Sequence, residues 1–193
     1  MIKRIILVGK SAAGKDYARK QLEDIGLIYG VSYTTRPARE GEVDGVDYNF
    51  LSLAKFEEMI DSDEWYEYVQ FNGWYYGTSN KQFYEGCQVF IMTPHGISLI
   101  KEKDRSSCMI AYLDIPFKIR KGRLIERKDN SDKISRRLAA DEVDFMDFID
   151  WDVKVMQDDF CFYELLDHAI LKQIIFDEHI ITKINNNYEY PTK

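Results

Sequence analysis

Near the N-terminus, Gly9 to Lys15 (GKSAAGK) fit a phosphate-binding pattern in which a glycine, four further residues and then Gly-Lys follow one another. The apolar run 5–8 before it predicts a short strand buried on both faces, and the spacing of Ala18, Leu22 and Ile25 predicts a helix after it. Glycines let the backbone curl so that N–H groups and the helix N-terminus point at an anion. A glycine-containing strand–helix turn would need no lysine at this position. We therefore predict a phosphate-binding loop made of Gly9, Lys10, Ser11, Ala12, Ala13, Gly14 and Lys15.

The residue after the lysine departs from this pattern. Ser or Thr is expected there because its hydroxyl ligates Mg²⁺, but the chain has Asp16. A carboxylate is also a good Mg²⁺ ligand, so Asp16 is a candidate metal ligand. Without a metal, its charge would weaken the binding of phosphates.

Length and composition favour one folded α/β domain. The chain has 193 residues, 45% of them hydrophobic, which is enough for a substantial core. Its net charge of −7 argues against a nucleic-acid polymer as partner. We find no signal peptide and no apolar run of membrane-spanning length, and the scattered Cys87, Cys108 and Cys161 suit reduced, buried thiols. We expect a cytoplasmic protein that is a monomer or homodimer.

Two groups of basic residues could bind phosphates. Arg36 and Arg39 lie in a polar, proline-containing stretch, where two guanidinium groups suit a phosphate dianion, although a solvated loop would look similar. A charged helical region after Pro116 breaks near 128–131, which indicates two short helices. They could form a lid over phosphates or a solvated helix face. Its basic residues are Lys118, Arg120, Lys121, Arg123, Arg127, Arg136 and Arg137.

The remaining pattern predicts a parallel sheet interrupted by a mixed β insertion at 32–80. Because ligands of such sheets lie at the carboxyl ends of the strands, the phosphate loop, Thr93 and Asp114 should surround one crevice. We expect 93–96 to be a loop and the acidic cluster 141–144 to be a solvated helix face. The expected strands are 26–32, 43–50, 64–71, 74–79, 88–92, 108–113 and 152–156, and the expected helices are 52–60, 81–85, 97–101 and 162–176.

Several of these segments together resemble the guanylate kinase family, in the same order along residues 5–160. The specific segments are Ser32-x-Thr34-Thr35-Arg36-x-x-Arg39, Gly41-Glu42-Val43-x-Gly45-x-Asp47-Tyr48, Glu67-Tyr68-x-x-Phe71-x-Gly73-x-Tyr75-Tyr76-Gly77-Thr78 and the arginines Arg123, Arg127 and Arg137. The resemblance implies a P-loop nucleoside monophosphate kinase fold, in which helices flank a central parallel sheet. Within one domain, 1–193, the core would be 1–31, 81–115 and 150–184, with a GMP-binding insertion (32–80), a helical lid (120–140) and a frayed tail (185–193).

The resemblance also implies ligands and residue roles. ATP with Mg²⁺ would lie on the phosphate loop, with Gln157 near its base. Lys15, Arg127 and Arg137 would be catalytic. The GMP phosphate would be held by Arg36, Arg39, Tyr48 and Tyr76, and guanine would be read by Ser32, Glu67 and Thr78. Guanine offers two neighbouring N–H donors that a carboxylate can accept together, whereas adenine lacks this pair.

The chain departs from the family at 91–93, where Ile-Met-Thr replaces Asp-x-Asp. One hypothesis is that Asp16 supplies the missing carboxylate. The sequence leaves three functions open. The chain could be a GMP or dGMP kinase, a nucleoside monophosphate kinase with changed acceptor specificity, or a non-catalytic module that binds a phosphorylated partner.

Overall fold

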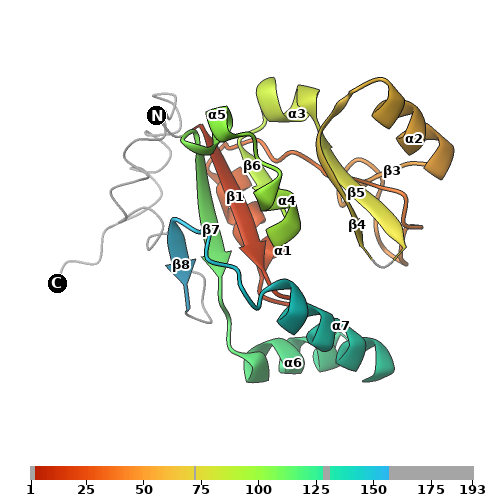
Figure 1. The fold of residues 1–193 in the computed structure, drawn as a ribbon. Helices are drawn as coiled ribbons and strands as arrows, with labels where there is room; N and C mark the ends of the chain where they lie inside the picture. The colour runs from red at the N-terminus through yellow and green to blue at the C-terminus, as the bar shows by residue number, and fades with distance from the viewer. Residues whose placement is uncertain (1–2, 72, 128–130, 157–193) are drawn as a thin grey trace.

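The computed structural model describes residues 3–71, 73–127 and 131–156 (Figure 1). A parallel sheet in the order β6-β1-β7-β8 forms its centre. The strands are β1 (Arg4–Gly9), β6 (Val89–Ile91), β7 (Cys108–Leu113) and β8 (Val153–Val155). Every residue of β1 and of β7 is buried. This confirms the prediction from their uninterrupted apolar runs, which are typical of parallel strands covered on both faces.

Two apolar clusters cover the two faces of this sheet. On one face, Ala18, Leu22 and Ile25 from and after α1 (Lys15–Asp24) pack on alternate strand residues such as Ile5 and Leu7. On the other face, Ile6 and Val8 pack with side chains from α3 (Asn80–Tyr84) and α4 (Pro94–Ser98). The alternation along β1 therefore divides its side chains between the two layers.

A second, mixed sheet has the order β3-β2-β5-β4 and lies beside the first (Figure 1). Its strands are β2 (Tyr33–Thr34), β3 (Asn49–Phe50), β4 (Trp65–Phe71) and β5 (Trp74–Ser79). Phe56 and Met59 of α2 (Leu53–Asp61) pack on Trp65 in a separate small core. Ser52 caps this helix, because its hydroxyl accepts a hydrogen bond from the Lys55 N–H. We call this unit the insertion sheet.

Helices α6 (Phe117–Glu126) and α7 (Ser131–Asp144) lie beyond the carboxyl ends of β1 and β7 (Figure 1). They confirm the expected pair of short helices. Leu124, Ile134 and Leu138 join them in a small cluster that also contacts Ala12 of the phosphate loop. We call this pair the α6–α7 unit. A further short helix is α5 (Glu102–Arg105). None of the helices in the described residues is long and apolar enough to cross a membrane.

Some expected elements are wrong or shorter. Instead of a strand at 26–32, a single parallel bridge joins Tyr29 to Val89. At Gly30 an added Cβ would lie 2.4 Å from the Phe90 ring, so only glycine fits there, and its N–H donates a hydrogen bond to the Val89 carbonyl oxygen at 2.9 Å. The segment 43–50 was expected to form a turn and then a strand, and it does so, with the strand β3 limited to its last two residues. The expected helix at 162–176 and the tail lie outside the described residues.

The expected loop at 93–96 is also wrong, because α4 begins there. The Thr93 hydroxyl accepts a hydrogen bond from the Gly96 N–H at 3.0 Å, and Pro94 occupies the first helical position. Both features start helices, since proline lacks only an N–H that would stay unpaired in the first turn. The α/β fold with a parallel sheet, flanking helices and a mixed insertion sheet is otherwise confirmed.

Candidate active site

The phosphate loop runs from Gly9 to Gly14 between β1 and α1. Gly14 has a φ of 96°, and Ala12 also has a positive φ, of 59°. At Gly9 an added Cβ would lie 2.8 Å from the Leu113 carbonyl oxygen, so this position has room only for glycine. The loop is therefore curled as the two glycines predict.

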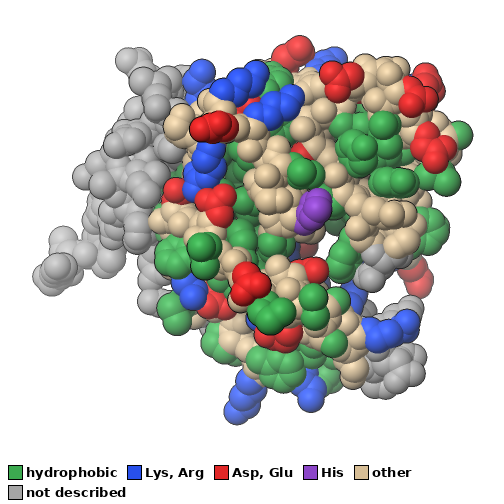
Figure 2. Space-filling view, viewed as in Figure 1, with side chains coloured by type: hydrophobic (Ala, Val, Ile, Leu, Met, Phe, Trp, Pro, Cys, Tyr) green, Lys and Arg blue, Asp and Glu red, His purple; other side chains and the backbone are tan. Residues whose placement is uncertain are grey.

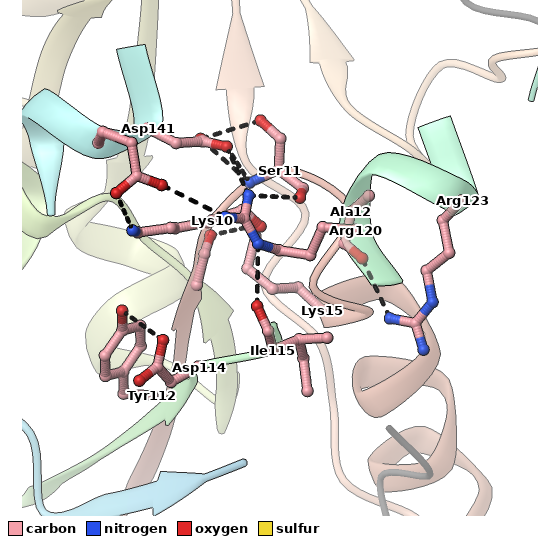
Figure 3. A network of polar contacts seen from close by, with 12 residues as sticks. Lys10, Ser11, Ala12, Lys15, Tyr112, Asp114, Ile115, Arg120, Arg123 and Asp141 are labelled. Carbon is pink, nitrogen blue, oxygen red and sulfur yellow. Dashed lines mark hydrogen bonds and ion pairs between the residues drawn. The ribbon is translucent and has the colours of Figure 1, made fainter. Parts of the chain in front are cut away.

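Lys15 lies at the centre of this loop. Its ammonium donates hydrogen bonds to the carbonyl oxygens of Gly9 at 2.6 Å and Lys10 at 3.3 Å (Figure 3). Burial lowers the pKa of Lys15, while the nearby carboxylates of Asp16 and Asp141 oppose this effect. The ammonium is therefore held within the loop by backbone carbonyl oxygens.

One cavity of about 510 Å³ joins the phosphate loop to the insertion sheet and the α6–α7 unit. Figure 2 shows the surface hollowed between these parts. Among the predicted site residues, Lys10, Ala13, Gly14 and Thr78 are not in its lining, and Gln157 lies outside the described residues. The others line it: Gly9, Ser11, Ala12, Lys15, Asp16, Ser32, Arg36, Arg39, Tyr48, Glu67, Tyr76, Arg127 and Arg137.

On the insertion sheet, Glu67 and Thr78 face each other across the β4–β5 pair. The Thr78 hydroxyl donates to Glu67 Oε1 at 2.7 Å, and both residues are buried. Burial raises the pKa of Glu67 to about 7, although the Thr78 hydrogen bonds oppose this. Thr78 does not line the cavity itself, but its hydrogen bond holds the carboxylate of Glu67, which does.

Arg36 lies in the same cavity and is held by a carboxylate. Its guanidinium donates to Glu42 Oε1 at 2.9 Å and lies over the Tyr48 ring at 5.2 Å. The rings of Tyr48 and Tyr76 meet edge to face at 6.0 Å. The Arg39 N–H also donates to Glu42, at 2.7 Å. Glu42 thus holds the Arg36 side chain and the backbone at Arg39, and both arginines line the cavity.

Two expected positions at the strand ends behave differently. Thr93 lines the cavity, whereas Asp114 pairs with Lys154 at 2.7 Å and accepts a hydrogen bond from the Tyr112 hydroxyl at 3.2 Å (Figure 3). Asp114 is not in the cavity lining of the described chain. The prediction that Asp114 borders the crevice is therefore wrong, because Lys154 on the neighbouring strand β8 pairs with its carboxylate.

The acidic cluster on α7 is only in part the solvated face that we expected, because residues 142–144 are exposed and Asp141 is not. Asp141 is buried and accepts hydrogen bonds from the backbone N–H and the hydroxyl of Ser11, and Glu142 pairs with Lys10 at 2.8 Å. Asp141 is buried and Glu142 is paired because the α6–α7 unit packs directly on the phosphate loop, where Ser11 and Lys10 lie. Among the described residues, no group of three or more His, Cys, Asp or Glu side chains is arranged to hold a metal.

Sequence reasoning assigned no role to several cavity residues, namely Tyr29, Glu42, Asp47, Asp141 and Asp144. Glu42 could have been found, since a carboxylate six positions from Arg36 in a polar turn can pair with it. Asp141 could not, because its contact with Ser11 spans 130 positions of the chain.

A curled Gly-Lys loop on a parallel sheet, next to a mixed sheet followed by two arginines that line the same cavity, fits the class of P-loop nucleoside monophosphate kinases. A family model described as guanylate kinase matches residues 1–173. The chain is 38% identical over 161 residues to a guanylate kinase of Bacillus anthracis, with 78% of each chain covered. It is 35% identical over 168 residues to a guanylate kinase of Nostoc sp., with 82% of this chain and 83% of the relative covered. This chain belongs to the guanylate kinase family.

A solved structure agrees with this at the level of the fold. The crystal structure of guanylate kinase from Anaplasma phagocytophilum matches with a TM-score of 0.67 at 20% identity, covering 89% of this chain and 85% of that one.

Proposed function

We propose that this chain transfers the terminal phosphoryl group of ATP to GMP or dGMP, giving ADP and GDP or dGDP. The observation that carries the proposal is the cavity in which the phosphate loop, the Arg36–Arg39 pair and the buried Glu67 carboxylate meet. The names of these two relatives, both guanylate kinases, support the same acceptor.

The acceptor would bind on the insertion sheet. Ionised Glu67 accepts the two neighbouring N–H groups of guanine, while the hydrogen bond from Thr78 holds the carboxylate in place. Adenine would leave this buried carboxylate unpaired, which costs binding energy. Ser32, Arg36, Arg39, Tyr48 and Tyr76 complete the acceptor site in this proposal.

The donor phosphates would bind on the loop. Lys15 leaves the Gly9 and Lys10 carbonyls and pairs with phosphate oxygens, and Arg127 and Arg137 approach the transferring group from the α6–α7 unit, which acts as the lid. Closure of the lid excludes water, which would otherwise accept the phosphoryl group.

Asp16 fits the place of a magnesium ligand. It follows Lys15 at the start of α1 and is among the residues that line the cavity, so it would offer a hard oxygen donor beside the donor phosphates. When bound, Mg²⁺ would neutralise charge on the donor phosphates. One carboxylate is enough because phosphates and water supply the other ligands.

The test is a coupled ADP-release assay with ATP and Mg²⁺ against GMP, dGMP, AMP, CMP, UMP and dTMP. ADP release with the two guanine acceptors alone is expected. Lys15→Met should lower this rate by about a thousandfold, which excludes a contaminating kinase. Turnover with other bases would mean a changed acceptor specificity. No turnover while GMP still binds would mean a binding module.

A further inference from the structure

A carboxylate of the chain itself lies on the phosphate loop. The two oxygens of Asp141 accept hydrogen bonds from the Ser11 N–H at 3.0 and 2.9 Å, and the Ser11 hydroxyl donates to Oδ1 at 3.0 Å (Figure 3). Backbone N–H groups of a curled loop are the donors that hold nucleotide phosphates. Asp141 therefore makes the kind of contact with Ser11 that a phosphate would make.

Arg120 fixes Asp141 in this position. Its guanidinium donates to Asp141 Oδ2 at 3.1 Å and to the Ile115 carbonyl at 3.0 Å, and the side chain is only 2% exposed. A guanidinium buried this far needs an anionic partner. The Arg120 guanidinium also donates to the Ser11 carbonyl at 3.5 Å, so it lies next to the loop. An anion bound on the loop would therefore be close enough to serve as the partner of Arg120.

Further contacts hold the α6–α7 unit on the loop on either side of Ser11. Glu142 pairs with Lys10 at 2.8 Å, and Arg123 donates to the Ala12 carbonyl at 3.1 Å. The Ala12 methyl packs on the cluster of Leu124, Ile134 and Leu138. The carboxylate contact thus belongs to a docked arrangement of the whole unit.

We propose that Asp141 is an internal competitor for the donor phosphate, and that ATP binds only when its phosphate displaces this carboxylate from Ser11. The exchange leaves the Arg120 guanidinium beside an anion in both states, first the carboxylate and then the phosphate. It also couples nucleotide binding to movement of α7, which carries Arg137. The inference rests on the proposed function, because it takes ATP to be the ligand of this loop.

A purely structural ion pair would behave differently from a competitor. Loss of a structural pair lowers thermal stability and leaves the ATP affinity unchanged or weaker. Loss of a competitor raises the affinity for ATP. While the carboxylate occupies the loop, only a small fraction of the protein can bind ATP, and this increases the apparent Kd.

The test is isothermal titration of the protein with Mg-ATP, without acceptor, for the wild type, Asp141→Asn and Asp144→Asn. Asparagine keeps the size of Asp141 but removes its charge, and we expect the Kd for ATP to fall about tenfold. Asp144 lies on the same helix and also lines the cavity. It is the matched control for a general loss of negative charge, and its Kd should change by less than about twofold.

Glu142→Gln provides a second variant at an exposed position, in case Asp141→Asn folds poorly. It removes the ion pairs of Glu142 to Lys10 and to Arg120, both of which hold α7 on the loop, and we expect the Kd for ATP to fall about threefold. An unchanged or raised Kd in a folded Asp141→Asn protein, or an equal fall in Asp144→Asn, would overturn the inference. If the wild type and all variants fail to bind ATP, the proposed function itself fails, and the inference fails with it.

Discussion

The pKa of Glu67 depends on its position between two antiparallel strands. The carboxylate is buried between β4 and β5, where it accepts a hydrogen bond from the Thr78 hydroxyl at 2.7 Å, and burial raises its pKa to about 7. Near neutral pH the group is therefore divided between a protonated form and an ionised form. Only the ionised form can accept both N–H groups of guanine.

This division predicts a pH-dependent acceptor affinity. As pH falls below about 7, Glu67 takes up a proton before guanine can bind, so the KM for GMP should rise by up to about tenfold per pH unit. As pH rises above 7, the KM should become constant. The measurement is the steady-state KM for GMP between pH 6 and 8.

The GMP phosphate also titrates, near pH ~6, so a control is needed. The Glu67→Gln variant keeps the titration of the phosphate but removes that of the carboxyl group. At pH 8 its KM for GMP should exceed that of the wild type by about a hundredfold. The ratio of the KM of the variant to that of the wild type should shrink as pH falls. A ratio that stays constant from pH 6 to 8 would contradict the role of Glu67.

At the scale of elements, the N-terminus of α4 restricts the space around Glu67. A Cβ added at Gly96 would lie 3.2 Å from Glu67 Oε2 and 3.5 Å from the Thr93 hydroxyl. The first distance is tighter than an ordinary contact, so the carboxylate would have to move by a few tenths of an ångström. The glycine at position 96 therefore leaves the room that the Glu67 carboxylate, which we propose reads the base, now occupies.

We predict that Gly96→Ala raises the KM for GMP about fivefold, because a small displacement weakens directional hydrogen bonds to a charged group. The KM for ATP should be unchanged. Gly122→Ala on α6 is the matched control, since an added Cβ there meets no atom within 4 Å. Steady-state kinetics of both variants measure this, and an equal rise in both KM values for Gly96→Ala would point to a general distortion instead.

The same elements show what local sequence signals can predict. The buried strands β1 and β7, the phosphate loop and the β4–β5 hairpin follow from apolar runs and turn residues that lie next to one another. The helix start at Thr93 carried a local signal, Thr-Pro, that the expectation of a loop overlooked. The segment 26–32 looked like a strand because it is apolar, but its ladder with β6 is limited to a single bridge between Tyr29 and Val89, and how far such pairing extends is a tertiary feature.

At the scale of the molecule, the site combines three distant parts of the chain. The family resemblance implied that the phosphate loop, the arginine pair and Glu67 serve one site, and in the structure all three line one cavity. The contact of Asp141 with Ser11 depends on how α7 packs on the loop, and no pattern along the sequence encodes it. Sequence reasoning therefore found the groups that we propose to bind substrate and missed the carboxylates that pair with the loop and the arginines.

The most direct test of the account follows the phosphoryl group itself. ATP labelled in its terminal phosphate is incubated with the protein, Mg²⁺ and GMP, and the labelled products are separated. The account predicts that the label appears in GDP in the same amount as ADP is formed. Label released as free phosphate, or none transferred while GMP remains bound, would contradict the assignment of this cavity to phosphoryl transfer between nucleotides.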